Sequence, residues 1–138
     1  MIDEYYVLDK DKEVDNMKEN RCIKNLLRLI NLLQENSTNI NSIDNTCSRP
    51  FLGNNLNNTI YNTRPISIYN KNNELLTITT DSGDTSFFRI ENINNNCCTL
   101  RGITNNNGVY TSTNNFITIK INCICVIRCY PDVQISNL

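Results

Sequence analysis

The residues of this sequence with the most potential for chemistry are its cysteines, and they are clustered. The stretch INCICVIRC, residues 121–129, holds three of the chain's seven cysteines, Cys123, Cys125 and Cys129. Thiols at this density can bind a metal ion, carry out redox chemistry, pack as small apolar side chains or form disulfide bonds. The chain has no histidine, so the commonest general base and metal ligand is missing.

The β-branched character of residues 117–129 predicts a strand, and side chains alternate between the two faces of a strand. The three cysteines then share one face with the isoleucines, and this face is expected to point into the core. Cα atoms two residues apart on a strand lie about 6.5–7 Å from each other, at or beyond the upper limit for a disulfide. Cys123 and Cys125 are therefore expected to serve the interior as small apolar residues or to bond partners on another strand or chain.

The remaining cysteines are spread along the chain. Cys97 and Cys98 are neighbours, so one is expected to point inward and the other to solvent. Cys22 lies beside the apolar stripe of a predicted helix, before a long connection that also contains Cys47. An odd total leaves one thiol unpaired unless two chains join. Bonds between chains, from Cys22 and from the outward member of the doublet, are the simplest interpretation.

A metal-binding module is the main alternative, with thiolates from Cys97, Cys123, Cys125 and Cys129 as ligands. Structural zinc sites usually take Cys-x2-4-Cys knuckles from two loops, whereas these residues follow a strand pattern. A redox enzyme is less favoured because no Cys-x-x-Cys pair occurs.

A hydrolase would need a carboxylate pair, for which Asp81, Asp84 and Glu91 are the nearest candidates. Turn chemistry and a solvated strand edge explain these three residues better. The sequence therefore predicts no enzyme, no catalytic residue and no cofactor.

The elements that position the cysteines follow from periodicity. Residues 14–36 are predicted to form an amphipathic helix, because apolar residues recur at spacings of three and four. Residues 1–13 are an acidic arm, and residues 37–64 are a polar connection. Short β-type runs with turn signals between them fill residues 65–138, with 14–138 as one assembly unit. The predicted fold is mainly β: an antiparallel, jelly-roll-like β-sandwich with one N-terminal amphipathic α-helix. The apolar residues of the helical stripe are Ile23, Leu26, Leu27, Ile30 and Leu33.

Composition excludes several classes of protein. A net charge of −1 over 138 residues argues against a nucleic-acid binder. No apolar run approaches the roughly 20 residues of a membrane span, and the N-terminus does not read as a secretory signal. Synthesis in a cytosol is therefore expected. Cytosolic thiols are normally kept reduced, so the high cysteine content needs a special explanation.

Four segments in order resemble the spore coat Y/Z and exosporium Y family. They are CSRPFLG at 47–53, NTRP at 62–65, FFRIENINNNCCTLR at 87–101 and ITIKINCICVIRCYPDVQI at 117–135. Members of that family are structural proteins made in the mother cell of a spore-forming bacterium. By this resemblance Cys47, Cys97, Cys123, Cys125 and Cys129 match family cysteines, Cys22 matches approximately, and Cys98 falls where a small residue is common.

The resemblance implies a function and partners. We expect a protein that assembles with itself, as a hexameric ring within a two-dimensional lattice, and with other coat or exosporium proteins. The layer surrounds the spore, and disulfides involving all seven cysteines cross-link it. Neither nucleic acid nor membrane is an expected partner.

Overall fold

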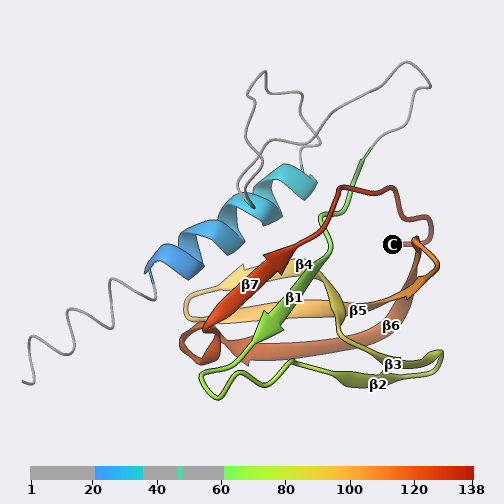
Figure 1. Ribbon diagram of the computed structural model, residues 1–138. Coiled ribbons are helices and arrows are strands. Elements are labelled where there is room, and N and C mark those ends of the chain that lie inside the picture. Colours follow the sequence, from blue (N-terminus) through green and yellow to red (C-terminus); the bar gives the residue numbers. More distant parts are fainter. Residues whose placement is uncertain (1–20, 36–46, 48–60) are drawn as a thin grey trace, which may run out of the picture.

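The N-terminal helix follows the predicted apolar stripe. The computed structural model describes residues 21–35, 47 and 61–138, and the helix covers residues 21–35 (Figure 1). Leu27, Ile30 and Leu33 are buried, whereas Leu32 on the other side is exposed. An amphipathic helix is thus confirmed, while the predicted arm at 1–13 and the first residues of the predicted helix lie outside the described residues.

A five-stranded antiparallel sheet forms most of the molecule, with the strand order β6-β5-β4-β1-β7 (Figure 1). A two-residue turn, Asn107 and Gly108, joins β5 to β6, and both residues have positive φ angles of 53° and 87°. Such a turn suits the right-handed twist of a hairpin, and asparagine and glycine adopt it readily. The strands of this sheet are β1 Ile66–Tyr69, β4 Phe87–Asn94, β5 Cys97–Asn106, β6 Val109–Lys120 and β7 Val126–Cys129.

A separate hairpin of β2 (Ile78–Thr80) and β3 (Gly83–Thr85) packs against β5 and β6. Gly102 on β5 lies at this close approach. A Cβ atom there would lie 2.8 Å from Cδ1 of Ile78, which is too close for any larger residue without a shift.

The core lies between the helix and one face of the sheet. Leu27 and Ile30 of the helix pack with side chains from β1, β4 and β5. A mainly β, antiparallel fold with one N-terminal helix is therefore confirmed. The stacked sheets of a jelly-roll-like sandwich are not confirmed, because the described strands form one five-stranded sheet and a hairpin. The sheet residues of the core cluster are Ile66, Ile68, Phe88, Ile90, Cys98 and Leu100, with Ile121 and Ile124 from the segment before β7.

The prediction of one continuous strand over 117–129 is wrong. β6 ends at Lys120, and a 3-10 turn, Ile121–Cys123, separates it from β7. The N–H of Ile124 donates to the carbonyl of Ile121 at 3.0 Å and closes this turn. Because the turn replaces a period of two by a spacing of three, Ile121 and Ile124 become the buried residues.

Candidate functional site

Two of the seven cysteines are joined within the chain. Cys47 and Cys129 form a disulfide, with their Cα atoms 5.4 Å apart. The bond links the predicted connection to the end of β7, across a sequence separation of 82. Cys129 therefore serves the domain itself.

A buried arginine organises the surroundings of this disulfide. The Arg64 side chain is fully buried, and its Nε and Nη2 atoms donate to the two carboxylate oxygens of Asp132 at 2.7 and 2.9 Å. Its Nη1 atom donates to the backbone carbonyl of Cys47 at 2.8 Å. Arg64 thus fixes the Cys47 backbone and the segment that follows Cys129 at the same point.

The helix is tied to the same residue. The backbone N–H of Arg64 donates to Oε1 of Gln34 at 3.1 Å, and Nε2 of Gln34 donates to the carbonyl of Ile90 at 2.7 Å. A buried charge is tolerated only when its hydrogen bonds are satisfied, and here a carboxylate and a carbonyl accept from the guanidinium. We call Gln34, Arg64, Asp132 and the Cys47–Cys129 disulfide the closure site.

Three other cysteines face solvent. Cys22 on the helix, Cys123 in the 3-10 turn and Cys125 just before β7 are exposed and unbonded. The expectation that Cys123 and Cys125 serve the interior is therefore wrong, because the turn reverses which side of the segment is buried. We call Cys22, Cys123 and Cys125 the exposed thiols.

The doublet Cys97–Cys98 divides as predicted. Cys98 on β5 is fully buried, and Cys97 is partly exposed. Burial disfavours the charged thiolate and raises the pKa of the Cys98 thiol to about 12. Because the thiolate is the reactive form, Cys98 is a packing residue in this fold.

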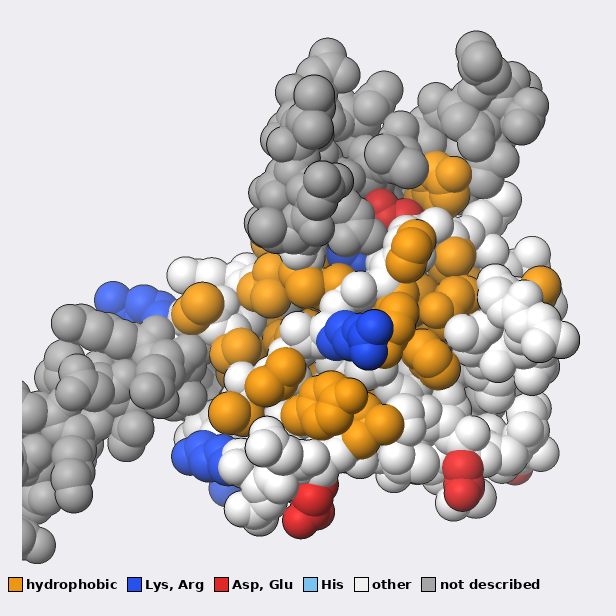
Figure 2. Space-filling view, in the orientation of Figure 1, with side chains coloured by type: hydrophobic (Ala, Val, Ile, Leu, Met, Phe, Trp, Pro, Cys, Tyr) orange, Lys and Arg blue, Asp and Glu red, His pale blue; other side chains and the backbone are white. Residues whose placement is uncertain are grey.

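Cys125 adjoins an apolar surface. Tyr69 of β1 pairs with Val126 of β7 on one side and with Leu75 on the other. Val126 and Leu75 are exposed. Figure 2 shows apolar side chains gathered over β1 and β7, around a basic side chain. Since Cys125 directly precedes Val126, a partner that covers this patch comes close to a free thiol.

The alternative metal site is not assembled in the structure. Cys129 is bonded to Cys47, so it cannot act as a thiolate ligand beside Cys123 and Cys125. Across residues 21–35 and 61–138, no three cysteine or carboxylate side chains are grouped in a way that could hold a metal ion.

The three candidate carboxylates do not form a catalytic pair. Asp84 on β3 accepts a hydrogen bond from the Thr79 hydroxyl across the hairpin at 2.8 Å, and Asp81 lies in the turn of this hairpin. Glu91 on β4 forms ion pairs with Arg89 and Arg101. Each of the three has a structural explanation.

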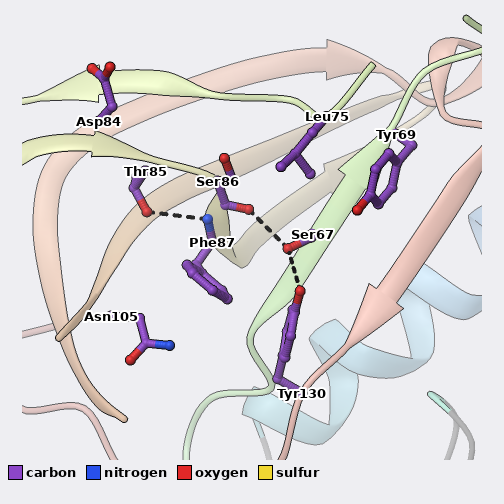
Figure 3. Close-up of a pocket in the computed structure, with 9 residues that line it drawn as sticks. All are labelled: Ser67, Tyr69, Leu75, Asp84, Thr85, Ser86, Phe87, Asn105 and Tyr130. Atoms are coloured by element: carbon purple, nitrogen blue, oxygen red, sulfur yellow. Dashed lines mark hydrogen bonds between the residues drawn. The ribbon is translucent and has the colours of Figure 1, made fainter. Parts of the chain in front are cut away.

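A cavity of about 330 Å³ beside β1 gathers hydroxyl groups and aromatic rings (Figure 3). The Ser67 hydroxyl donates to the carbonyl of Ser86 at 3.1 Å and shares a hydrogen bond of 3.0 Å with the Tyr130 hydroxyl. Asp84, a carboxylate on the cavity wall, points away from Ser67 in Figure 3. Neither partner of Ser67 is a strong base, so this geometry does not activate the serine as a nucleophile.

Comparison with protein families shows which family this chain belongs to. The chain matches the family described as spore coat protein Z over residues 10–109. It belongs to that family. Neither the curated proteins nor the solved structures contain a match to it. Membership in the spore coat protein Z family confirms the resemblance and implies a structural role in the surface layer of a spore.

The match to spore coat protein Z includes Gln34, Cys47 and Arg64 of the closure site but ends before Asp132. The C-terminal cysteines Cys123, Cys125 and Cys129 also lie beyond it. The described helix is neither long nor apolar enough to span a membrane.

Sequence reasoning missed most of the closure site. It singled out the NTRP segment that contains Arg64 but gave the arginine no role, and it left Gln34 and Asp132 unmarked. A signal was nevertheless present, because an arginine between Thr63 and Pro65, next to a predicted strand, needs hydrogen-bond acceptors if that segment is buried.

Proposed function

We propose that this chain is a structural protein of the spore coat or exosporium that assembles with itself into an ordered, disulfide-cross-linked layer. Its synthesis takes place in the mother cell, and its assembled unit is a hexameric ring within a two-dimensional lattice. Other coat or exosporium proteins adjoin this layer. The observation that carries the proposal is the presence of three exposed, unbonded thiols in a member of the spore coat protein Z family.

Five of the seven cysteines divide into two chemical groups in this proposal. The closure site uses Cys47 and Cys129 within the chain, so these two do not join subunits. The exposed thiols Cys22, Cys123 and Cys125 are available to neighbouring subunits. Two thiols from different subunits form one disulfide and release two protons and two electrons, which molecular oxygen outside the mother cell accepts.

The location of the exposed thiols supports a layer rather than a simple dimer. Cys22 lies on the helix, whereas Cys123 and Cys125 lie between β6 and β7. Thiols on two different elements allow one subunit to bond two neighbours, and heterologous contacts of this kind generate rings or open arrays.

The experiment compares the air-oxidised protein with a variant in which Cys22, Cys123 and Cys125 are all replaced by serine. On non-reducing SDS gels the original protein is expected to give a ladder of covalent oligomers, and the variant a monomer. Electron microscopy with and without a thiol reductant then tests for an ordered layer.

A matched control removes the other pair of cysteines, with Cys47→Ser and Cys129→Ser together. This control is expected to keep the ladder. Monomer as the sole species of the original protein after oxidation would refute covalent assembly, and stoichiometric zinc in protein purified under reducing conditions would favour the metal-binding alternative.

A further inference from the structure

One edge of the sheet has backbone groups without partners. β6 is the last strand in the order β6-β5-β4-β1-β7, so only β5 pairs with it. The N–H of Ile121 donates to the carbonyl of Asn96 at 2.7 Å and sets the alternation of the β5–β6 ladder. In an antiparallel ladder every second residue turns its N–H and C=O away from the neighbouring strand. Phe116, Thr118 and Lys120 therefore direct these groups to the open edge.

The open stretch is confined to residues 116–120. Nearer the hairpin turn, an irregularity at 113–115 interrupts the pairing, and the Ser112 hydroxyl donates to the carbonyl of Asn137 at 3.0 Å. Within residues 21–35 and 61–138, no group bonds to the backbone of 116, 118 or 120 from the edge side. The unpaired part of β6 is thus a five-residue strand, FITIK.

This stretch lacks the usual protection of an edge strand. Native proteins block their edges with charges, proline or short strands, because an open edge pairs readily with another chain. Residues 116–120 contain no proline, and Lys120 at the end is the one charged residue. The opposite edge differs, because β7 has four residues with Arg128 among them and ends at the disulfide-bonded Cys129.

We propose that residues 116–120 of β6 pair antiparallel with the same residues of a second copy of this chain, about a two-fold axis at Thr118. The proposal deepens the proposed function, on which it rests, because it names a non-covalent contact of the assembly. It joins two five-stranded sheets edge to edge, as in other cases of strand addition.

The sequence of this stretch is complementary to itself in that register. Thr118 faces Thr118 of the second copy, and threonine pairs are favourable across strands. The half-buried Ile117 faces Ile119 of the second copy. The exposed Phe116 faces Lys120, an attractive cation–π pair. The two lysines do not meet, because they lie at opposite ends of the paired stretch, and the Arg101 guanidinium that lies over the Phe116 ring is paired with Glu91.

The backbone agrees with this register as well. Residues 116, 118 and 120 are those that turn toward the edge, so a two-fold axis at Thr118 brings donors of one copy to acceptors of the other. Such an interface is isologous and closes after two copies. Because this contact alone stops at a dimer, the layer also needs the disulfides of the exposed thiols to extend.

The test uses a background without exposed thiols, Cys22→Ser, Cys123→Ser and Cys125→Ser, which keeps the Cys47–Cys129 bond. Its mass is measured by analytical ultracentrifugation over a range of concentrations. We expect a reversible dimer. Thr118→Lys places two like charges at the axis and is expected to raise the dimer Kd at least about tenfold. Thr111→Lys, on an exposed residue of β6 outside the open stretch, is the matched control and is expected to leave the Kd unchanged.

Charge complementation makes the test specific. Thr118→Asp alone is expected to weaken the dimer, whereas an equimolar mixture of the Thr118→Lys and Thr118→Asp proteins is expected to form a heterodimer. Far-UV circular dichroism checks that each variant is folded. A background protein that stays monomeric, or an oligomer that Thr118→Lys does not change, overturns this inference. The disulfide ladder of the original protein is a separate readout, so failure of covalent assembly is distinguishable from failure of the β6 contact.

Discussion

Cys125 and Cys129 are four residues apart, yet their surroundings differ in every respect. Cys129 ends β7 inside the closure site, bonded to Cys47 beside the buried Arg64–Asp132 ion pair. Cys125 lies just before the same strand, is exposed and has no disulfide partner. The difference shows that the neighbouring elements decide the chemistry of each sulfur. Cys129 stabilises the fold of its own chain, whereas Cys125 is available to a neighbouring molecule.

The largest effect is expected when the buried Arg64–Asp132 ion pair of the closure site is broken. Arg64→Met leaves the Asp132 carboxylate buried without its counter-ion and is expected to cost about 3–5 kcal/mol of unfolding free energy. Urea denaturation measures the loss. Adding Asp132→Leu to Arg64→Met removes the orphaned charge and is expected to restore part of the stability. Lys71→Met, on an exposed residue, is the surface control.

Removing the intrachain disulfide is expected to have the next largest effect. Cys129→Ser releases a loop with a sequence separation of 82, and loss of a native disulfide typically costs about 2–4 kcal/mol. Its matched control is Cys125→Ser, four residues away. Equal melting temperatures for the two variants would contradict the distinction between bonded and unbonded sulfur.

The buried Cys98 thiol predicts a pH dependence. Its folded pKa, raised to about 12 by burial, exceeds the unfolded value, so this contribution to stability is fully present below about pH 9 and is lost as the pH rises toward 12. At pH 10 the expected loss is about 1 kcal/mol, since one pKa unit corresponds to 1.36 kcal/mol.

The control for this prediction is Cys98→Ala, which lacks the titrating thiol. Stability measured from pH 8 to pH 11 should fall more steeply in the original protein than in Cys98→Ala, and other titrating groups cancel in the comparison. Parallel curves would show that Cys98 is accessible to solvent. Rapid alkylation of Cys98 in the folded protein would show the same.

The smallest effect on stability is expected when the exposed thiols are replaced. Cys22→Ser, Cys123→Ser and Cys125→Ser should each change the unfolding free energy of the monomer by no more than about 0.5 kcal/mol, because surface substitutions rarely do more. The measurement is made under identical non-oxidising conditions. A loss of 2 kcal/mol or more, on the order of a lost disulfide, in any of the three would assign that cysteine the interior role first expected of Cys123 and Cys125.

Local periodicity explains which parts of the fold were predictable. The three-and-four spacing of Leu27, Ile30 and Leu33 identified the buried face of the helix, and the turn residues around Gly108 marked the β5–β6 hairpin. The predicted alternation of buried and exposed side chains over residues 117–129 ends at Ile121, where the 3-10 turn begins. A 3-10 turn is favoured there by burial of Ile121 and Ile124, which a strand pattern does not distinguish from continued alternation.

Contacts between distant residues explain the rest. Arg64 and Asp132 are separated by 68 residues, and nothing local in either segment indicates the other. Seven cysteines likewise permit many pairings, so the partner of Cys129 could not be read from spacing. The resemblance to a family indicated disulfide cross-linking but did not distinguish bonds within the chain from bonds between chains.

The Cys47–Cys129 bond also determines how the protein carries tension. When neighbouring subunits hold the chain through Cys22 and Cys125, the shortest covalent route runs from 22 to 47, crosses the disulfide and returns from 129 to 125. At about 3.5 Å per residue, this route extends to roughly 100 Å and bypasses β1 to β6 entirely. Single-molecule pulling between these two sites should therefore unfold the helix and detach β7 while the pairing of β1, β4, β5 and β6 persists, and reduction of the bond should transfer the load to these strands. In the proposed layer, the disulfide would therefore confine the extension to the helix, the connection and β7, and protect the loop between Cys47 and Cys129 from the load.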